Sequence, residues 1–202
     1  MKKIVILLLV ALTLTGCTVV RINTDDIDNT INVILSKNNE LYNRIGKGYK
    51  YYVPRSVNYI DTVEFNDKLY SDGNYYYLYV DAISYYHNKD IDYEKKEDIY
   101  YSREFVINDK KGYLEIQEKD DKYLINFFYN YARIQTLVEY EDINKVILNS
   151  SYILSTVKFN HEVIKLMLDD EFFTSKEETY DIFESEVETD NFLEYVDEEI
   201  ES

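Results

Sequence analysis

The sequence has one cysteine, one proline, no tryptophan and only five glycines among its 202 residues. A single cysteine cannot form a disulfide within the chain, so a folded domain must be stabilised by its core. The scarcity of proline and glycine excludes a long flexible linker. The sequence also has no glycine-rich phosphate loop and no G-x-S-x-G nucleophile elbow, so common motifs for phosphate binding and serine hydrolysis are missing.

Basic residues are scarce as well, with 22 Lys and Arg against 39 Asp and Glu. Nucleic acid binding requires a basic footprint that releases phosphate counterions, and the composition predicts none. Residues 169–202 hold 15 acidic residues and a single base, Lys176. We expect this segment to be either a disordered acidic tail or an amphipathic segment that folds on a protein partner. The overall acidity argues against electrostatic adhesion to anionic lipid.

Metal-binding residue types are few, and we predict no metal site and no cofactor. The two histidines, His87 and His161, stand alone, and no free thiol accompanies them, so a zinc site is not expected. Residues 88–94 alternate oxygen-bearing side chains, as calcium loops do. However, Tyr93 stands where an EF-hand requires glycine, so we interpret the segment as a charged loop.

The first 16 residues have the features of a secretory signal. Lys2 and Lys3 precede an apolar run from Ile4 to Leu12, and small residues follow. The run is shorter than the roughly 20 apolar residues that a membrane-spanning helix needs. We therefore expect export of the chain and removal of residues 1–16.

The signal ends in Leu14-Thr15-Gly16-Cys17, which resembles the lipobox of bacterial lipoproteins. The resemblance covers residues 1–17 only. It implies cleavage between Gly16 and Cys17 and attachment of diacylglycerol, with acyl chains such as palmitate, to the Cys17 thiol as a thioether, which also accounts for a lone cysteine in an exported protein. Several acyl chains give stable attachment, so the resemblance places the protein on the extracytoplasmic face of the cell membrane. Secretion of the chain without lipid is the alternative.

Residues 25–168 have the length and patterning of one α+β domain, following a tether at 17–24. Apolar residues recur at helical spacing near each end, and β-prone runs separated by turn residues lie between them. We expect an antiparallel meander of about four to six strands, with the C-terminal helices packed on one face. The predicted helices are 25–45, 142–157 and 160–168; the predicted strands are 50–53, 62–70, 74–86, 99–107, 113–118 and a β-prone stretch at 122–138; the predicted hairpin turns are 71–74 and 108–112; and 88–98 is a loop.

Tyrosine is the most unusual component, with 23 copies in the chain. Adjacent residues on a strand face opposite sides, so some tyrosines must lie away from the core. Packing of a good β-former is one interpretation. The other is an aromatic surface that binds a peptide, glycan or protein, for which the candidate residues are Tyr75, Tyr77, Tyr79 and Tyr85.

These observations favour a membrane-anchored binding or protein-interaction domain without catalysis. No residue is singled out as catalytic. One alternative is a small hydrolase of envelope polymers that uses paired carboxylates, which the sequence cannot pick out among 39 acidic residues. Another is a lipoprotein assembly or chaperone factor.

Overall fold

The computed structural model describes residues 27–63, 66–94 and 99–169. The chain divides into two units, residues 1–164 and 165–202, and the fold below is that of the first. The predicted signal, Cys17 and the acidic tail beyond residue 169 lie outside the described residues. The elements are α2 (Ile27–Leu35), β1 (Arg44–Ile45), β2 (Tyr49–Tyr51), β3 (Asn58–Val63), β4 (Asn66–Ser71), β5 (Asn74–Val80), α3 (Ala82–Tyr86), β6 (Ile99–Ile107), β7 (Lys110–Lys119), β8 (Lys122–Tyr129), β9 (Ala132–Val138), the 3-10 turn η1 (Tyr140–Asp142), α4 (Ile143–Ser155), β10 (Lys158–Phe159) and α5 (His161–Asp169).

The fold is α+β, as predicted, with a larger sheet than expected. Seven antiparallel strands lie in the order β3-β4-β5-β9-β8-β7-β6, and a second sheet has the order β1-β2-β10. The large sheet consists of two meanders, β3-β4-β5 and β6-β7-β8-β9. Only four residue pairs join them, from Tyr77 with Gln135 to Val80 with Ala132.

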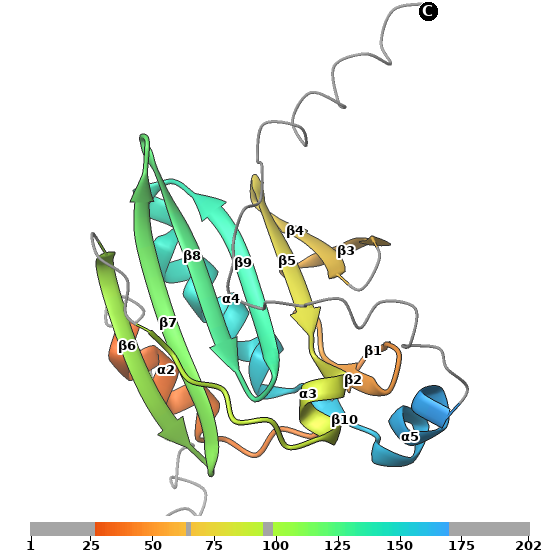
Figure 1. Cartoon of the computed structure of the whole chain (residues 1–202). Coiled ribbons are helices and arrows are strands. Elements are labelled where there is room, and N and C mark those ends of the chain that lie inside the picture. The colour runs from red at the N-terminus through yellow and green to blue at the C-terminus, as the bar shows by residue number, and fades with distance from the viewer. Residues whose placement is uncertain (1–26, 64–65, 95–98, 170–202) are drawn as a thin grey trace, which may run out of the picture. The chain divides into compact units, whose positions relative to one another are not determined.

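Helices α2 and α4 pack on one face of the large sheet, called the inner face below (Figure 1). Ile147 and Leu154 of α4 are fully buried there, as are Leu114 and Ile125 of the sheet. Helix α2 is also fixed to β6, because Arg103 forms an ion pair of 2.9 Å with Asp28. The apolar stripe predicted for residues 142–157 therefore forms the centre of the core.

Tight turns explain the strand boundaries. Asp72 and Gly73 both have positive φ, which is the geometry of a two-residue type I′ hairpin, so the predicted 71–74 turn is confirmed. Asn108 and Asp109 make the second predicted hairpin in the same way. The turn at Asn130–Tyr131 was missed, and residues 122–138 are two strands, since the turn contains no glycine and its tyrosine adopts φ 60°.

Three predicted boundaries are wrong. The strand predicted for 62–70 is two strands, because β3 ends at Val63 and β4 begins at Asn66 and pairs back on it. The helix predicted for 25–45 ends at Leu35, and residues 44–45 form a strand, because Leu41, Tyr42 and Ile45 are exposed and give a helix nothing to bury. The strand predicted for 74–86 ends at Val80. The Asp81 side chain accepts a hydrogen bond from the Ser84 N–H, which begins the short helix α3.

The later helices agree with prediction. Helix α4 begins and ends within two residues of the predicted bounds. Asn160 accepts hydrogen bonds from Val163 and Ile164, so it caps α5 as expected. None of the helices in the described ranges 27–63, 66–94 and 99–169 is long and apolar enough to cross a membrane.

Candidate functional site

The outer face of the large sheet, opposite α2 and α4, carries three of the four candidate tyrosines. Tyr75, Tyr77 and Tyr79 alternate with buried inner-face residues along β5, so their side chains share one face. Tyr75 is 46% exposed and the other two are half-buried. The row is about 13 Å long, since alternate residues on a strand are about 6.6 Å apart. We call these three residues the tyrosine row.

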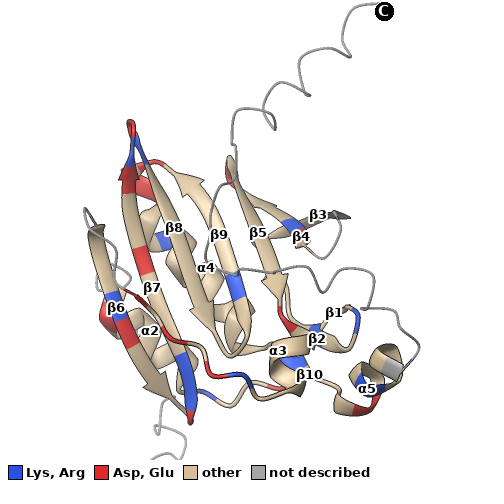
Figure 2. Ribbon diagram, viewed as in Figure 1, with Lys and Arg blue, Asp and Glu red and all other residues tan. Residues whose placement is uncertain are grey.

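Two cations flank the tyrosine row. The Lys68 Nζ on β4 lies 4.5 Å from the ring centre of Tyr75. The Arg133 Cζ on β9 lies 5.9 Å from the ring centre of Tyr79. Figure 2 shows blue segments on β4 and β9 on either side of β5, which itself carries no charged residue. A cation over a tyrosine ring is favourable, and it also covers that face of the ring.

The fourth candidate, Tyr85, does not belong to this surface. It lies in α3, where its ring stacks on Phe159 of β10 at 3.9 Å between centres and meets Tyr131 edge-on. This cluster joins α3 to the start of β9 and to the small sheet. Placing Tyr85 with the tyrosine row was therefore wrong, because the predicted strand ends before it.

Residues 88–94 cross the outer face beside β6 and β7. Tyr93 stacks on Tyr113 of β7 with 4.5 Å between ring centres, and its hydroxyl donates to the Glu115 carboxylate at 3.0 Å. Burial, together with the hydrogen bond to Glu115, raises the pKa of Tyr93 to about 12. Burial also raises the pKa of Tyr113 to about 12. The segment is thus a loop that covers part of the outer face of the sheet.

The charged part of this segment binds a lysine of the chain itself. Lys111 Nζ lies 2.5 Å from Asp90 and 3.8 Å from Asp92. Its ammonium therefore balances part of the negative charge of these two carboxylates. Over the described ranges of the chain, no group of three or more His, Cys, Asp or Glu side chains could hold a metal ion.

A cleft of about 360 Å³ lies between this segment and the edge strand β6. Tyr113 and Phe128 line it together with Tyr93, and Glu104 and Lys111 supply charges. Val106 at its border is 68% exposed. The cleft combines aromatic walls with charged groups, but its volume is at the lower end of the range for small-molecule sites.

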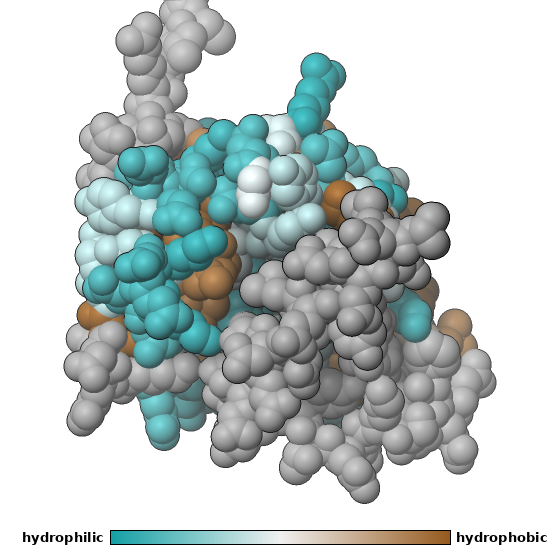
Figure 3. Space-filling model, turned by 90° about the horizontal axis from the view of Figure 1, so that it is seen from above, coloured by the Kyte–Doolittle hydropathy of each residue, from teal (hydrophilic) through white to brown (hydrophobic). Residues whose placement is uncertain are grey.

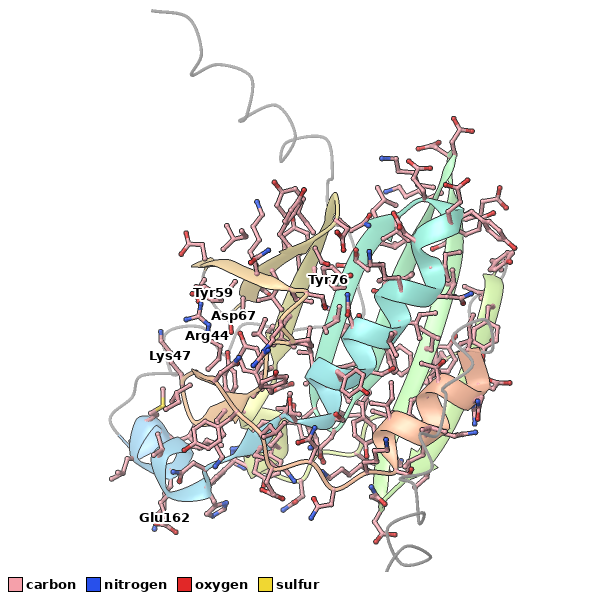
Figure 4. All side chains as sticks on the ribbon, turned by 180° about the vertical axis from the view of Figure 1, so that it is seen from behind. Arg44, Lys47, Tyr59, Asp67, Tyr76 and Glu162 are labelled. Carbon is pink, nitrogen blue, oxygen red and sulfur yellow. The ribbon has the colours of Figure 1, made fainter. Side chains whose placement is uncertain are left out.

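A buried carboxylate lies where the two sheets meet. Asp67 of β4 is 5% exposed and accepts hydrogen bonds from the Tyr51 hydroxyl at 2.6 Å and the Thr62 hydroxyl at 2.5 Å. The Arg44 Cζ lies 3.5 Å from the ring centre of Tyr59 nearby. Figure 4 shows Arg44, Tyr59 and Asp67 grouped at this junction. Burial, then the hydrogen bond to Asp67, raises the pKa of Tyr51, so its hydroxyl remains a donor.

The buried carboxylates of the described residues are Asp67, Asp81 and Glu115, and none stands beside another. Asp67 and Glu115 lie on opposite faces, four strand spacings or about 19 Å apart. Glycoside hydrolysis by two carboxylates requires a separation below about 10 Å. Asp81 is committed to capping α3.

Seen from the end that carries the 71–74 and 119–122 turns, the coloured surface is mainly hydrophilic, with hydrophobic residues in separate patches (Figure 3). The outer-face cations are the features that sequence reasoning missed. The cross-strand register places Lys68 opposite Tyr77 and Arg133 opposite Tyr79, and a predicted register for the β4-β5 hairpin would have found the first of these. Comparison with known protein families, curated proteins and solved structures finds no match.

Proposed function

We propose that the protein is a lipoprotein, anchored to the extracytoplasmic face of the membrane through Cys17, and that its domain binds a protein partner on the tyrosine row. The observation that carries the proposal is the arrangement of Tyr75, Tyr77 and Tyr79 between Lys68 and Arg133. Tyrosine and arginine are enriched at protein interfaces and in their energetic hot spots.

The ring contacts favour a protein over a glycan. Sugars stack on open ring faces, whereas Lys68 and Arg133 lie over the faces of Tyr75 and Tyr79. Tyr75 is the exposed member of the row, and Lys68 and Arg133 place positive charge along it, which suits a partner with apolar side chains and carboxylates. The separation of Asp67 from Glu115 gives no support to the alternative of hydrolysis by paired carboxylates.

The test is site-specific photo-crosslinking on intact cells. A photoreactive phenylalanine analogue replaces Tyr75 in one chain and Tyr100 in another, because Tyr100 is equally exposed at 49% but lies on β6. We expect one discrete protein adduct from position 75 and none from position 100.

The charge of the surface supplies the second arm. Lys68→Glu should reduce the adduct from position 75 at least tenfold, whereas Lys37→Glu, at an exposed position just after α2 on the inner side of the sheet, should not change it. Equal adducts from positions 75 and 100 would contradict binding at the tyrosine row. Retention of the protein on isolated cell-wall polymer without any protein adduct would favour a glycan ligand.

A further inference from the structure

Residues 41–60 form a basic island in an acidic protein. They contain Arg44, Lys47, Lys50 and Arg55 and no acidic residue, whereas the chain as a whole has a net charge of −17. The island includes the whole β1-β2 hairpin and ends in the first residues of β3. The overall composition conceals this local positive charge.

The inner side of the hairpin is fixed to the domain. Tyr51 is 1% exposed and donates to Asp67, and Tyr49 is 8% exposed with its ring 6.1 Å from that of Tyr51. The Asn43 side chain bonds both the N–H and the carbonyl of Val53, which extends the pairing beyond the short strands. The hairpin is thus held in place on the Tyr51 side, and at its tip the Gly48 carbonyl accepts a hydrogen bond from the Asn160 N–H.

The outer side of the same hairpin is exposed and apolar. Residues paired across strands share a face, so Ile45, Lys50 and Lys158 lie together on the side away from Tyr51. Ile45 is 78% exposed. The Lys50 Nζ lies 4.1 Å from the ring centre of Tyr42, which places Tyr42 on this side as well.

Tyr42 is an exposed member of this surface, at 51%, and one glycine shapes the tip of the hairpin. A Cβ at Gly46 would lie 2.2 Å from the Tyr49 ring, so only glycine allows that ring to fold under the turn. The hairpin therefore buries Tyr49 while it exposes Ile45 immediately before the turn.

We infer that this surface, consisting of Tyr42, Ile45 and Lys50, docks on an anionic lipid membrane. Exposed aliphatic and tyrosine side chains beside lysines are what the interface of a bilayer accommodates, with the apolar groups among the headgroups and the ammonium groups on the lipid phosphates. A hydrated anionic polymer would satisfy Lys50 but would offer nothing to the exposed side chain of Ile45.

The inference rests on the proposed lipid anchor. Nine residues lie between Cys17 and Ile27, and an extended chain of that length spans at most about 32 Å. The anchor would hold the domain near the membrane, and the hairpin would then fix its orientation. Docking through β1-β2 would leave the tyrosine row, on a different sheet, for a partner.

A single introduced thiol tests the inference. Cys17 is the only cysteine, so in the lipidated protein Ile45→Cys is the one free thiol for an environment-sensitive dye. Val106→Cys is the matched control, because Val106 is comparably exposed at 68% on β6. The lipidated chains are reconstituted with vesicles of phosphatidylcholine alone or mixed with phosphatidylglycerol.

We expect the dye at position 45, but not at 106, to shift to blue emission and to be quenched by a lipid-borne quencher on the phosphatidylglycerol vesicles. Lys50→Glu should weaken this docking about fivefold per unit of charge removed. Aqueous emission from position 45 on phosphatidylglycerol vesicles overturns the inference. A shift caused equally by soluble polyphosphate without vesicles also overturns it and identifies a polyanion site.

Failure of the anchor is distinguishable in the same samples. The parent chain without added cysteines should take up no dye and should float with phosphatidylcholine vesicles. Labelling of Cys17, or absence of flotation, would contradict the anchor, whereas the emission difference between positions 45 and 106 reports on the hairpin alone.

Discussion

The two faces of the seven-stranded sheet are buried by different means. The inner face is mainly aliphatic and is covered by α2 and α4, whose buried residues include Ile31 and Ile147. The outer face has tyrosines, amides and charges, and, among the described residues, the segment 88–94 covers part of it through contacts such as Tyr93 with Glu115. Aliphatic burial favours the folded state without directional contacts, whereas the outer cover depends on a few polar groups. The inner face therefore supplies most of the apolar burial of the core.

Alkaline pH should destabilise both faces at once and is the largest effect expected. Burial raises the pKa of Tyr113 on the outer face and of Tyr129 on the inner face to about 12. In the unfolded chain both ionise near their ordinary pKa of about 10, so the unfolded state loses protons first. Stability is complete below about pH 10 and falls by about 1.4 kcal/mol per pH unit for each tyrosine up to about pH 12.

Urea denaturation at pH 8, 10, 11 and 12 measures this loss, and ultraviolet absorbance of tyrosinate gives the titration. Tyrosines that titrate completely near pH 10 in the folded protein would contradict the assigned burial.

Truncation of one aliphatic side chain on each face should separate the faces. Ile147 is fully buried on the inner side, and its change to Ala should cost about 2–5 kcal/mol through lost burial and a cavity. Leu137 on the outer side is 41% exposed, and Leu137→Ala should cost less than about 1 kcal/mol. Thermal and chemical denaturation of the two variants measure both numbers. Equal losses would mean that the outer face contributes to the core.

A smaller effect is expected from loosening the outer cover. Tyr93→Phe keeps the ring stacking on Tyr113 but removes the hydrogen bond to buried Glu115, at a cost of about 1–3 kcal/mol. Lys111→Gln removes an exposed ion pair with Asp90 and should cost less than about 1 kcal/mol. Amide hydrogen exchange in residues 88–94 should accelerate more in the first variant than in the second. The reverse order would show that the ion pair holds the cover in place.

The sequence predicted the fold class well because periodicity and turn chemistry are local. The β6-β7 hairpin and α4 were predicted closely, since Asn108-Asp109 supplies positive φ and the apolar spacing of α4 is regular. Leu41 and Ile45 misled the prediction of the first helix, because spacing alone cannot distinguish a buried stripe from an exposed one.

The candidate surface was predicted only where it depends on local sequence. Alternation along β5 correctly placed Tyr75, Tyr77 and Tyr79 on one face. The position of Arg133 beside Tyr79 depends on pairing between β5 and β9, which are some fifty residues apart in the chain. The junction at Asp67 depends on contact between two sheets. Neither arrangement leaves a local signal in the sequence.

The four residue pairs between β5 and β9, which we call the seam, have a consequence for how the molecule folds. Each meander consists of hairpins between neighbouring strands, so each can form from local contacts at small cost in loop entropy. Joining them requires closure of a loop of some fifty residues for only four residue pairs. We expect the two meanders to form early and separately, and the seam to close late. The pairing of Phe159 with Tyr49, which joins segments far apart in the chain, should also form late. A chain held apart at this seam would expose two open strand edges, so correct folding depends on how quickly four residue pairs meet.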